Sequence, residues 1–172
     1  EVGSRGIEQA LLNNELDVGV LLQPFDTQTF NSIELCNYPL MVLLRRDATW
    51  ATRKKINLEE LQHQSFLMFP ENFSLNSIIL DACKQHGFYP TIACRTSQWH
   101  LLADMVLQRM GIALLPQYYT DMLDPSLFAA VPLEKPNIQW HLVMAWKKNL
   151  PVSPAVQAWL SIVRQHFQHI KP

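Results

Sequence analysis

The stretch that decides the fold is Thr96-Ser-Gln-Trp-His-Leu-Leu-Ala-Asp-Met-Val-Leu-Gln-Arg-Met-Gly-Ile-Ala-Leu-Leu-Pro116. Its hydroxyl residues Thr96 and Ser97 are typical of a helix cap. Apolar residues then recur at i, i+3, i+4, i+7 and i+11, which predicts a helix with one buried face. These residues are Trp99, Leu102, Ala103, Val106 and Met110. Gly111 predicts a left-handed helix end, and the apolar run 112–115 closed by Pro116 predicts a strand buried on both faces, as in a parallel sheet.

A second strand is predicted just before this stretch, at residues 91–95. A strand that runs into a polar cap at the start of a helix forms a crevice, and the first amides of the helix point into it. Such a crevice favours a small anion.

The composition is typical of a globular chain. The 172 residues are 48% hydrophobic and 17% charged, and the longest apolar run is far too short to cross a bilayer. The formal net charge of −1 provides no basic surface for nucleic acid. The cysteines Cys36, Cys83 and Cys94 are odd in number and widely spaced, which favours reduced, buried thiols in a cytoplasmic protein over a disulfide framework.

The rest of the chain alternates short apolar runs with helical patterns, which predicts an α/β fold with mostly parallel sheets flanked by helices. Strands are predicted at 17–22, 31–36, 39–44, 65–69, 128–133 and 138–146, the last with Ile138, Trp140, Leu142, Met144 and Trp146 on one face. Caps are predicted at Ser4, at Asn57 with Glu60 as its capping-box partner, at Asn72 or Ser74, and at Ser153 before Pro154. The last helix carries Val156, Trp159, Leu160, Val163, Phe167 and Ile170 on its inner side.

The pattern restarts at Phe69-Pro70 and again between Leu133 and Pro136. No flexible linker accompanies either restart, so we interpret both as crossings between two lobes of one structure.

Five segments in order carry a family likeness: Glu1-Val-Gly-Ser4 with its helix, Leu16-Asp-Val-Gly-Val20, Pro39-Leu-Met-Val-Leu-Leu-Arg-Arg-Asp47, Met110-Gly-Ile-Ala-Leu-Leu-Pro116 and Ser153-Pro-Ala-Val-Gln-Ala-Trp159. Together they resemble the effector-binding domain of LysR-type transcriptional regulators, and the likeness runs through almost the whole chain.

The resemblance implies a periplasmic-binding-protein-like (type 2) fold of two α/β lobes joined by two crossing hinge strands. Lobe I would be residues 1–69 plus 139–172, and lobe II residues 70–138. A small effector, polar or anionic, would bind in the cleft between the lobes. The regulator would be a cytoplasmic homodimer or homotetramer without a membrane partner. It would contact DNA only through an N-terminal winged helix-turn-helix, which this sequence lacks together with the first strand and helix of lobe I.

Carried over residue by residue, the resemblance assigns effector contacts to both lobes. Ser4 matches a helix-start hydroxyl of lobe I. The lobe II positions are Asn72, Phe73, Ser74, Thr96, Ser97 and Gln98. Leu22 lies where regulators that respond to aromatic-degradation diacids have arginine, which argues against a dicarboxylate effector.

Each candidate has an alternative role. Ser4, Ser74, Thr96 and Ser97 either bind the effector or only cap helices. Arg95 either pairs with an anionic effector or is a solvated residue at a strand end. Trp99 either walls the pocket or packs in the core, and Phe69 and Phe73 share that ambiguity.

No reactive site is predicted. The sequence has no G-x-S-x-G, P-loop or H-E-x-x-H motif, which argues against an enzyme and gives no catalytic residue. His166 and His169 are one helical turn apart without a third ligand, so neither a metal nor another cofactor is predicted. His100 and Asp104 are interpreted as a solvated pair. A solute-binding protein of a transport system is the alternative function, since it would use the same two lobes.

Overall fold

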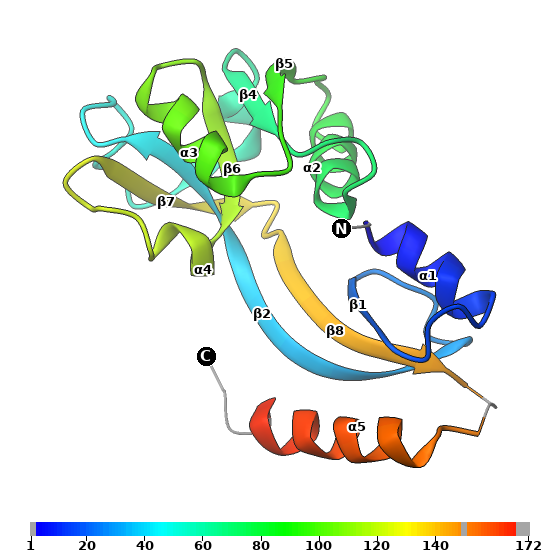
Figure 1. Ribbon diagram of the computed structural model, residues 1–172. Coiled ribbons are helices and arrows are strands. Elements are labelled where there is room, and N and C mark those ends of the chain that lie inside the picture. The colour runs from blue at the N-terminus through cyan, green and yellow to red at the C-terminus, as the bar shows by residue number, and fades with distance from the viewer. Residues whose placement is uncertain (1–2, 149–150, 168–172) are drawn as a thin grey trace. The chain divides into compact units, whose positions relative to one another are not determined.

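The computed structural model describes residues 3–148 and 151–167, and its contacts divide the chain into two units. Unit 1 comprises Glu1–Asn37 and Trp140–Pro172, and unit 2 comprises Tyr38–Gln139. The elements in chain order are α1 (Ser4–Leu12), β1 (Gly19–Leu22), β2 (Phe30–Arg45), β3 (Ile56–Asn57), the 3-10 turn η1 (Leu58–Leu61), β4 (Ser65–Met68), α2 (Ser74–Gln85), β5 (Thr91–Arg95), α3 (Trp99–Leu107), β6 (Ile112–Pro116), α4 (Gln117–Thr120), β7 (Phe128–Lys135), β8 (Gln139–Lys147) and α5 (Pro154–Phe167) (Figure 1).

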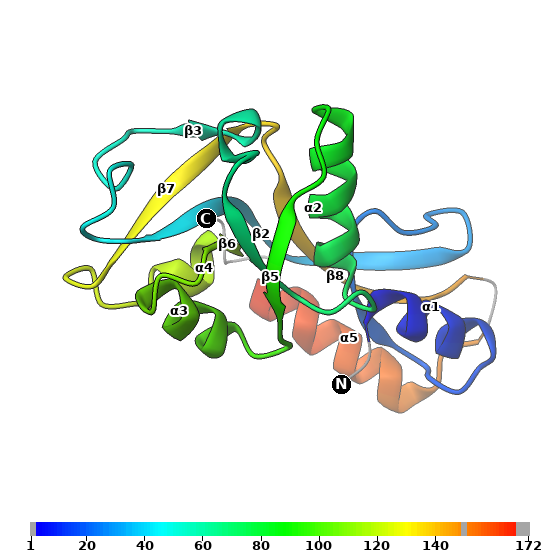
Figure 2. The same ribbon diagram turned by 90° about the horizontal axis from the view of Figure 1, so that it is seen from above.

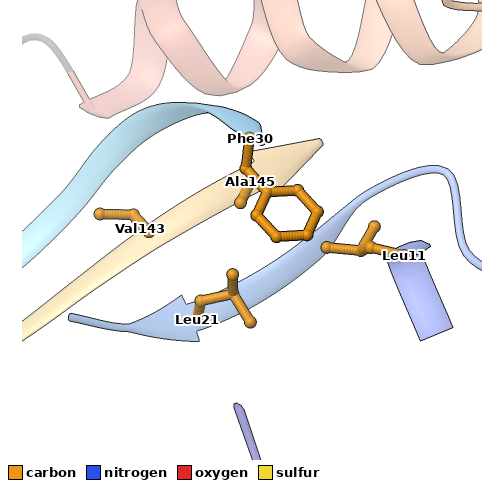
Figure 3. Close-up of a cluster of buried hydrophobic side chains, with 5 residues drawn as sticks. All are labelled: Leu11, Leu21, Phe30, Val143 and Ala145. Atoms are coloured by element: carbon orange, nitrogen blue, oxygen red, sulfur yellow. The ribbon is translucent and has the colours of Figure 1, made fainter. Parts of the chain in front are cut away.

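In unit 1, β8 is covered on both of its faces because alternate side chains of a strand point to opposite sides. Val143 and Ala145 pack with three further buried side chains whose apolar ends converge in Figure 3. These are Leu11 of α1, Leu21 of β1 and Phe30 of β2. Met144 and Trp146 face the other way and pack against Leu160 and Val163 of α5.

The helix α5 begins as the sequence predicts. The Ser153 Oγ accepts the N–H of Val156 at 3.3 Å, and Pro154 is the first helical residue. Leu160 and Val163 are the buried residues of this helix, whereas Trp159 is half exposed. Ile170 of the predicted last helix, and Glu1 and Val2 of the predicted family segment, lie outside the described residues.

In unit 2, the short strand β4 lies between β5 and β6 and is parallel to both. The strand β2 is antiparallel to β6 and β7, and β3 is parallel to β7. In unit 1, β1 and β8 are antiparallel. The sheets are therefore mixed, and the prediction of mostly parallel sheets is wrong in this respect. Figure 2 shows α2 and α3 on opposite sides of β4 and β5.

The strand β2 also corrects the predicted boundaries. Residues 31–36 and 39–44 form one continuous strand, and the division between the units falls inside it, after Asn37. The second division falls after Gln139, at the start of β8. The predicted crossings at Phe69-Pro70 and 133–136 instead lie within unit 2. An extended backbone that changes its pairing partners needs no turn residue, so the sequence carries no signal at Asn37.

Three helices end in a left-handed residue. The residues are Asn14 after α1, Gly87 after α2 and Arg109 after α3, with φ of 60°, 83° and 60°. At each end, the N–H of the left-handed residue and the N–H of the residue after it donate to carbonyl oxygens of the last helical turn. The left-handed backbone costs roughly 1–2 kcal/mol for most residues, whereas glycine adopts it freely and asparagine more readily than other side chains.

The predicted left-handed stop at Gly111 is therefore wrong, because Arg109 occupies that position. Gly111 has a different role: a Cβ placed there would collide with the backbone carbonyl oxygen of Ser65. The absence of a side chain lets the start of β6 approach β4.

The three cysteines are free thiols, as predicted, but only Cys83 is buried, so the prediction of burial is wrong for Cys36 and Cys94. Cys83 is buried in α2, and burial raises its pKa to about 11. Burial also raises the pKa of Cys36, which is half-buried in β2.

Because the thiolate is the reactive form, we expect Cys83 to resist thiol reagents in the folded chain. At pH 8 only about one Cys83 side chain in a thousand is ionised. A timed reaction with a chromogenic disulfide at pH 8 should modify Cys94 first and Cys83 only on unfolding. Modification of Cys83 at the rate of Cys94 in the native chain would contradict this assignment.

Candidate functional site

The carboxyl ends of β4 and β5 meet at one edge of unit 2. The two strands are parallel, and Met68 is paired with Arg95 at their ends. The strand β6 is parallel to β4, so it ends at the same edge, where α4 begins. Ligands of open α/β sheets bind outside this edge. The structure thus brings together three segments: residues 69–74, residues 96–99 and α4. We call this edge the carboxyl edge.

The loop after β4 is held from inside by Asn76, which sequence reasoning missed. The Asn76 side chain is 1% exposed, and its Nδ2 donates to the Phe69 carbonyl oxygen at 2.6 Å. The Phe69 ring stacks on Phe73 at 5.7 Å between centroids. The signal for Asn76 was an amide on the apolar face of the helical pattern.

Neither Asn72 nor Ser74 caps α2, so that prediction is wrong. The N-cap residue is Phe73, and its carbonyl accepts the N–H of Asn76. No side chain caps the helix there; the Asn76 side chain fixes the preceding loop instead. Asn72 is exposed and Ser74 is half-buried at this edge.

The segment after β5 is attached to the end of β4. The Thr96 N–H donates to the Met68 carbonyl at 3.0 Å, and the Thr96 Oγ1 accepts the N–H of Gln98 at 3.2 Å. The helix α3 begins only at Trp99, with Gln98 as N-cap, so the predicted caps Thr96 and Ser97 are wrong. The Thr96 hydroxyl instead closes a turn just before the helix, and Ser97 is exposed.

Arg95 lies at the rim of the carboxyl edge. Its side chain is 37% exposed, and its Nη2 is 3.3 Å from the Glu71 Oε1. An exposed pair of this kind contributes about 0–1 kcal/mol. The pair joins the two loops, and its position agrees with the solvated alternative. A role of Arg95 in effector binding stays a prediction.

Trp99 links α3 to α4. Its ring stacks on the Tyr119 ring, with 4.8 Å between the two centroids. The Tyr119 ring contacts that of Tyr118, which in turn contacts that of Tyr38. Trp99 is half-buried, so it packs against neighbours and also reaches the surface. Sequence reasoning missed these tyrosines. The signal that could have found them was the Tyr118-Tyr119 pair, which comes directly after the strand that ends at Pro116.

Ser4 lies in unit 1 at the start of α1. The N-cap residue is Gly3, and the Ser4 Oγ accepts the N–H of Leu22 at 3.0 Å. The predicted capping role is therefore wrong, because the hydroxyl joins the end of β1 to the helix. A hydroxyl that accepts an amide N–H keeps its own hydrogen for donation. Ser4 and Thr96 both have this arrangement, which suits an acceptor such as a carboxylate.

Within residues 3–148 and 151–167 no group of three or more His, Cys, Asp or Glu side chains could hold a metal ion. His169 of the predicted histidine pair is outside this range. No helix in the described part of the chain is long and apolar enough to cross a membrane.

Comparison with known proteins identifies the family. The model of the LysR substrate binding domain matches residues 1–168. The chain belongs to this family. Among curated proteins, the HTH-type transcriptional regulator YwbI of Bacillus subtilis is 34% identical over 167 residues, which is 97% of this chain and 56% of that protein. The chain spans a little over half the length of the curated relatives it matches.

Two solved structures share the fold of this LysR substrate-binding domain. The regulatory domain of CcmR from Synechocystis PCC6803, in complex with 2-PG, has a TM-score of 0.85 at 18% identity, covering 98% of this chain and 81% of that chain. The effector-binding domain of QuiR, in complex with shikimate, has a TM-score of 0.80 at 17% identity, covering 99% and 80%. The expected fold is confirmed.

The relatives also decide between the function classes. They are transcriptional regulators, which agrees with a ligand-sensing domain and with the prediction that the chain is not an enzyme. A solute-binding protein of a transport system is not favoured.

Proposed function

We propose that this LysR substrate-binding domain senses a small polar or anionic organic effector at the carboxyl edge of unit 2. The observation that carries the proposal is the convergence of two loops there, joined by the bond from Thr96 to Met68, with the Thr96 hydroxyl held as a donor. In the whole regulator, the effector state would be passed to a separate DNA-binding module. We further propose that the regulator is a cytoplasmic homodimer or homotetramer without a membrane partner.

The chemistry of the edge supports the ligand class. The helices α2 and α3 both begin there, and the first amides of a helix together with its dipole attract negative charge. The Trp99–Tyr119 stack offers an apolar wall beside these amides. An effector with one anionic group and a flat or apolar body fits this combination.

The residues proposed to contact the effector are those predicted from the sequence: Ser4, Asn72, Phe73, Ser74, Arg95, Thr96, Ser97 and Trp99. Ser4 belongs to unit 1, and its role is tested separately from the others. The effector would act as a switch only through a difference in its affinity for two arrangements of the domain.

Replacing Thr96 with valine should weaken effector binding roughly tenfold, because one hydrogen-bond donor to a charged oxygen is lost. A thermal-shift screen of small organic acids on the 172-residue chain would provide the ligand. Titration of that ligand into the variant then measures its affinity. Thr91→Val is the matched control, since Thr91 is exposed at the opposite end of the same strand.

Ser4→Ala should also weaken binding of the same ligand. Because this substitution leaves the Leu22 N–H without its partner, the melting temperature of the ligand-free variant is measured as well, to separate lost stability from lost binding. A ligand bound with unchanged affinity by both Thr96→Val and Ser4→Ala would show that the site is elsewhere.

A further inference from the structure

A cavity of about 540 Å³ lies in unit 2 where β4 and β6 begin, at the edge opposite the carboxyl edge. The end of β2 and the end of α3 complete its wall. We call it the amino-edge cavity. Its lining includes the charged residues Arg45, Asp47 and Arg109 and the ring of Trp50.

Asp47 holds the two arginines of the amino-edge cavity in place. The Arg45 Nε and Nη2 donate to the two oxygens of Asp47 at 2.8 and 2.7 Å, and its Nη1 donates to the Leu107 carbonyl at 2.8 Å. The Arg109 Nη2 reaches the same carboxylate at 3.1 Å. The Arg45 hydrogen bonds lower the pKa of Asp47, so this carboxylate stays ionised. Two guanidinium groups facing one carboxylate leave an excess positive charge on the lining.

The backbone of Arg109 is unfavourable for its residue type. Of the three left-handed helix ends, two carry asparagine or glycine, which tolerate this conformation, and the third carries Arg109. Its side chain is 71% exposed, and an exposed ion pair with Asp47 contributes too little to offset the strain. Strained residues of this kind gather at functional sites. The strain at Arg109 points to a role of its side chain beyond the pair with Asp47.

The remaining lining defines a small compartment with polar and apolar parts. Trp50, Val106 and Ile112 supply apolar surface, and Thr49 and Gln64 supply a hydroxyl and an amide. Arg109 uses one of its five N–H donors on Asp47, which leaves donors on both of its other nitrogens for a second carboxylate.

We propose that the amino-edge cavity is a second small-molecule site, which takes an organic carboxylate with an apolar body and uses Arg109 as its charged contact. This site is separate from the proposed effector site, because the two lie at opposite edges of β4. The domain would then bind small molecules at both edges of unit 2.

The probe is benzoate, titrated into the isotope-labelled 172-residue chain and followed by two-dimensional NMR. We expect a saturable shift of the Trp50 indole signal, which is assigned from its loss in Trp50→Phe. In Arg109→Gly the apparent affinity at Trp50 should fall tenfold or more, while relief of the backbone strain raises the melting temperature by roughly 2–4 °C. Arg46→Gln is the matched control, since Arg46 is exposed next to Arg45 but does not line the cavity.

Three results would overturn the proposal: no shift at Trp50, an equal affinity in Arg109→Gly, or an equal loss in Arg46→Gln. Shifts confined to Trp99 would place benzoate at the carboxyl edge, which supports the proposed function and rejects the second site. Shifts at Trp50 alone would support the second site without bearing on the first.

Discussion

The chain with Gly111→Ala should lose about 3 kcal/mol of its free energy of unfolding. A Cβ at Gly111 would overlap the Ser65 carbonyl oxygen, and this backbone atom at the start of β4 cannot rotate away as a side chain can. The strands β4 and β6 must separate to admit the methyl group, and the pairing of Phe66 with Ile112 weakens. Urea denaturation followed by circular dichroism measures the loss.

The matched control is Gly19→Ala in β1 of unit 1. Its Cβ would meet the Cγ2 of Ile7, a side-chain methyl group that moves away when α1 shifts slightly, whereas the Ser65 carbonyl is a backbone atom held in a sheet. The free energy of unfolding should therefore fall less, by about 1 kcal/mol. If Gly111→Ala were no more destabilising than Gly19→Ala, the close approach of β6 to β4 would be incorrect.

The second large effect is expected at Asn76. Asn76→Leu removes the donor to the Phe69 carbonyl in a buried environment, and an unpaired buried carbonyl costs about 1–3 kcal/mol. The loop 69–74 is then no longer fixed to the start of α2, so affinity at the carboxyl edge should fall together with the free energy of unfolding. Denaturation and ligand titration on the same sample measure both.

Asn76→Asp separates the hydrogen bond from side-chain volume. The introduced carboxylate would face the Phe69 carbonyl without a proton, and burial raises its pKa above that of an exposed aspartate. Its protonated form can donate to the carbonyl. The variant should therefore recover stability relative to the wild type as the pH falls through this pKa. A stability difference that is independent of pH would contradict the role assigned to Asn76.

The sequence predicted the helix α3 and the strand β6 because their apolar residues follow periods that only buried elements keep. It predicted the Glu60 half of the capping box as well, since the Glu60 Oε1 accepts the Asn57 N–H at 2.9 Å. Among the predicted hydroxyl caps, it was right for Ser153 and wrong for Ser4, Thr96 and Ser97. Ser4 and Thr96 stand next to helix starts, but each bonds a different amide, and that choice depends on strands far away in the sequence.

The division inside β2 escaped prediction because a strand that changes partners keeps its local backbone. Asn76 left a signal, since it is an amide on the apolar face of its helix, but its partner, the Phe69 carbonyl, follows only from the fold. The carboxyl edge was predicted from its two loops. The tyrosines of α4 join it through β6, a relationship that follows only from the order of strands in the sheet.

The most direct test of the proposed site is a crystal structure of the chain grown with the acid selected by the thermal-shift screen. The account predicts ligand density with an oxygen within about 3.2 Å of the Thr96 Oγ1 or the Ser97 Oγ, beside the Trp99 ring. A ligand bound without contact to residues 69–74 or 96–99 would contradict it.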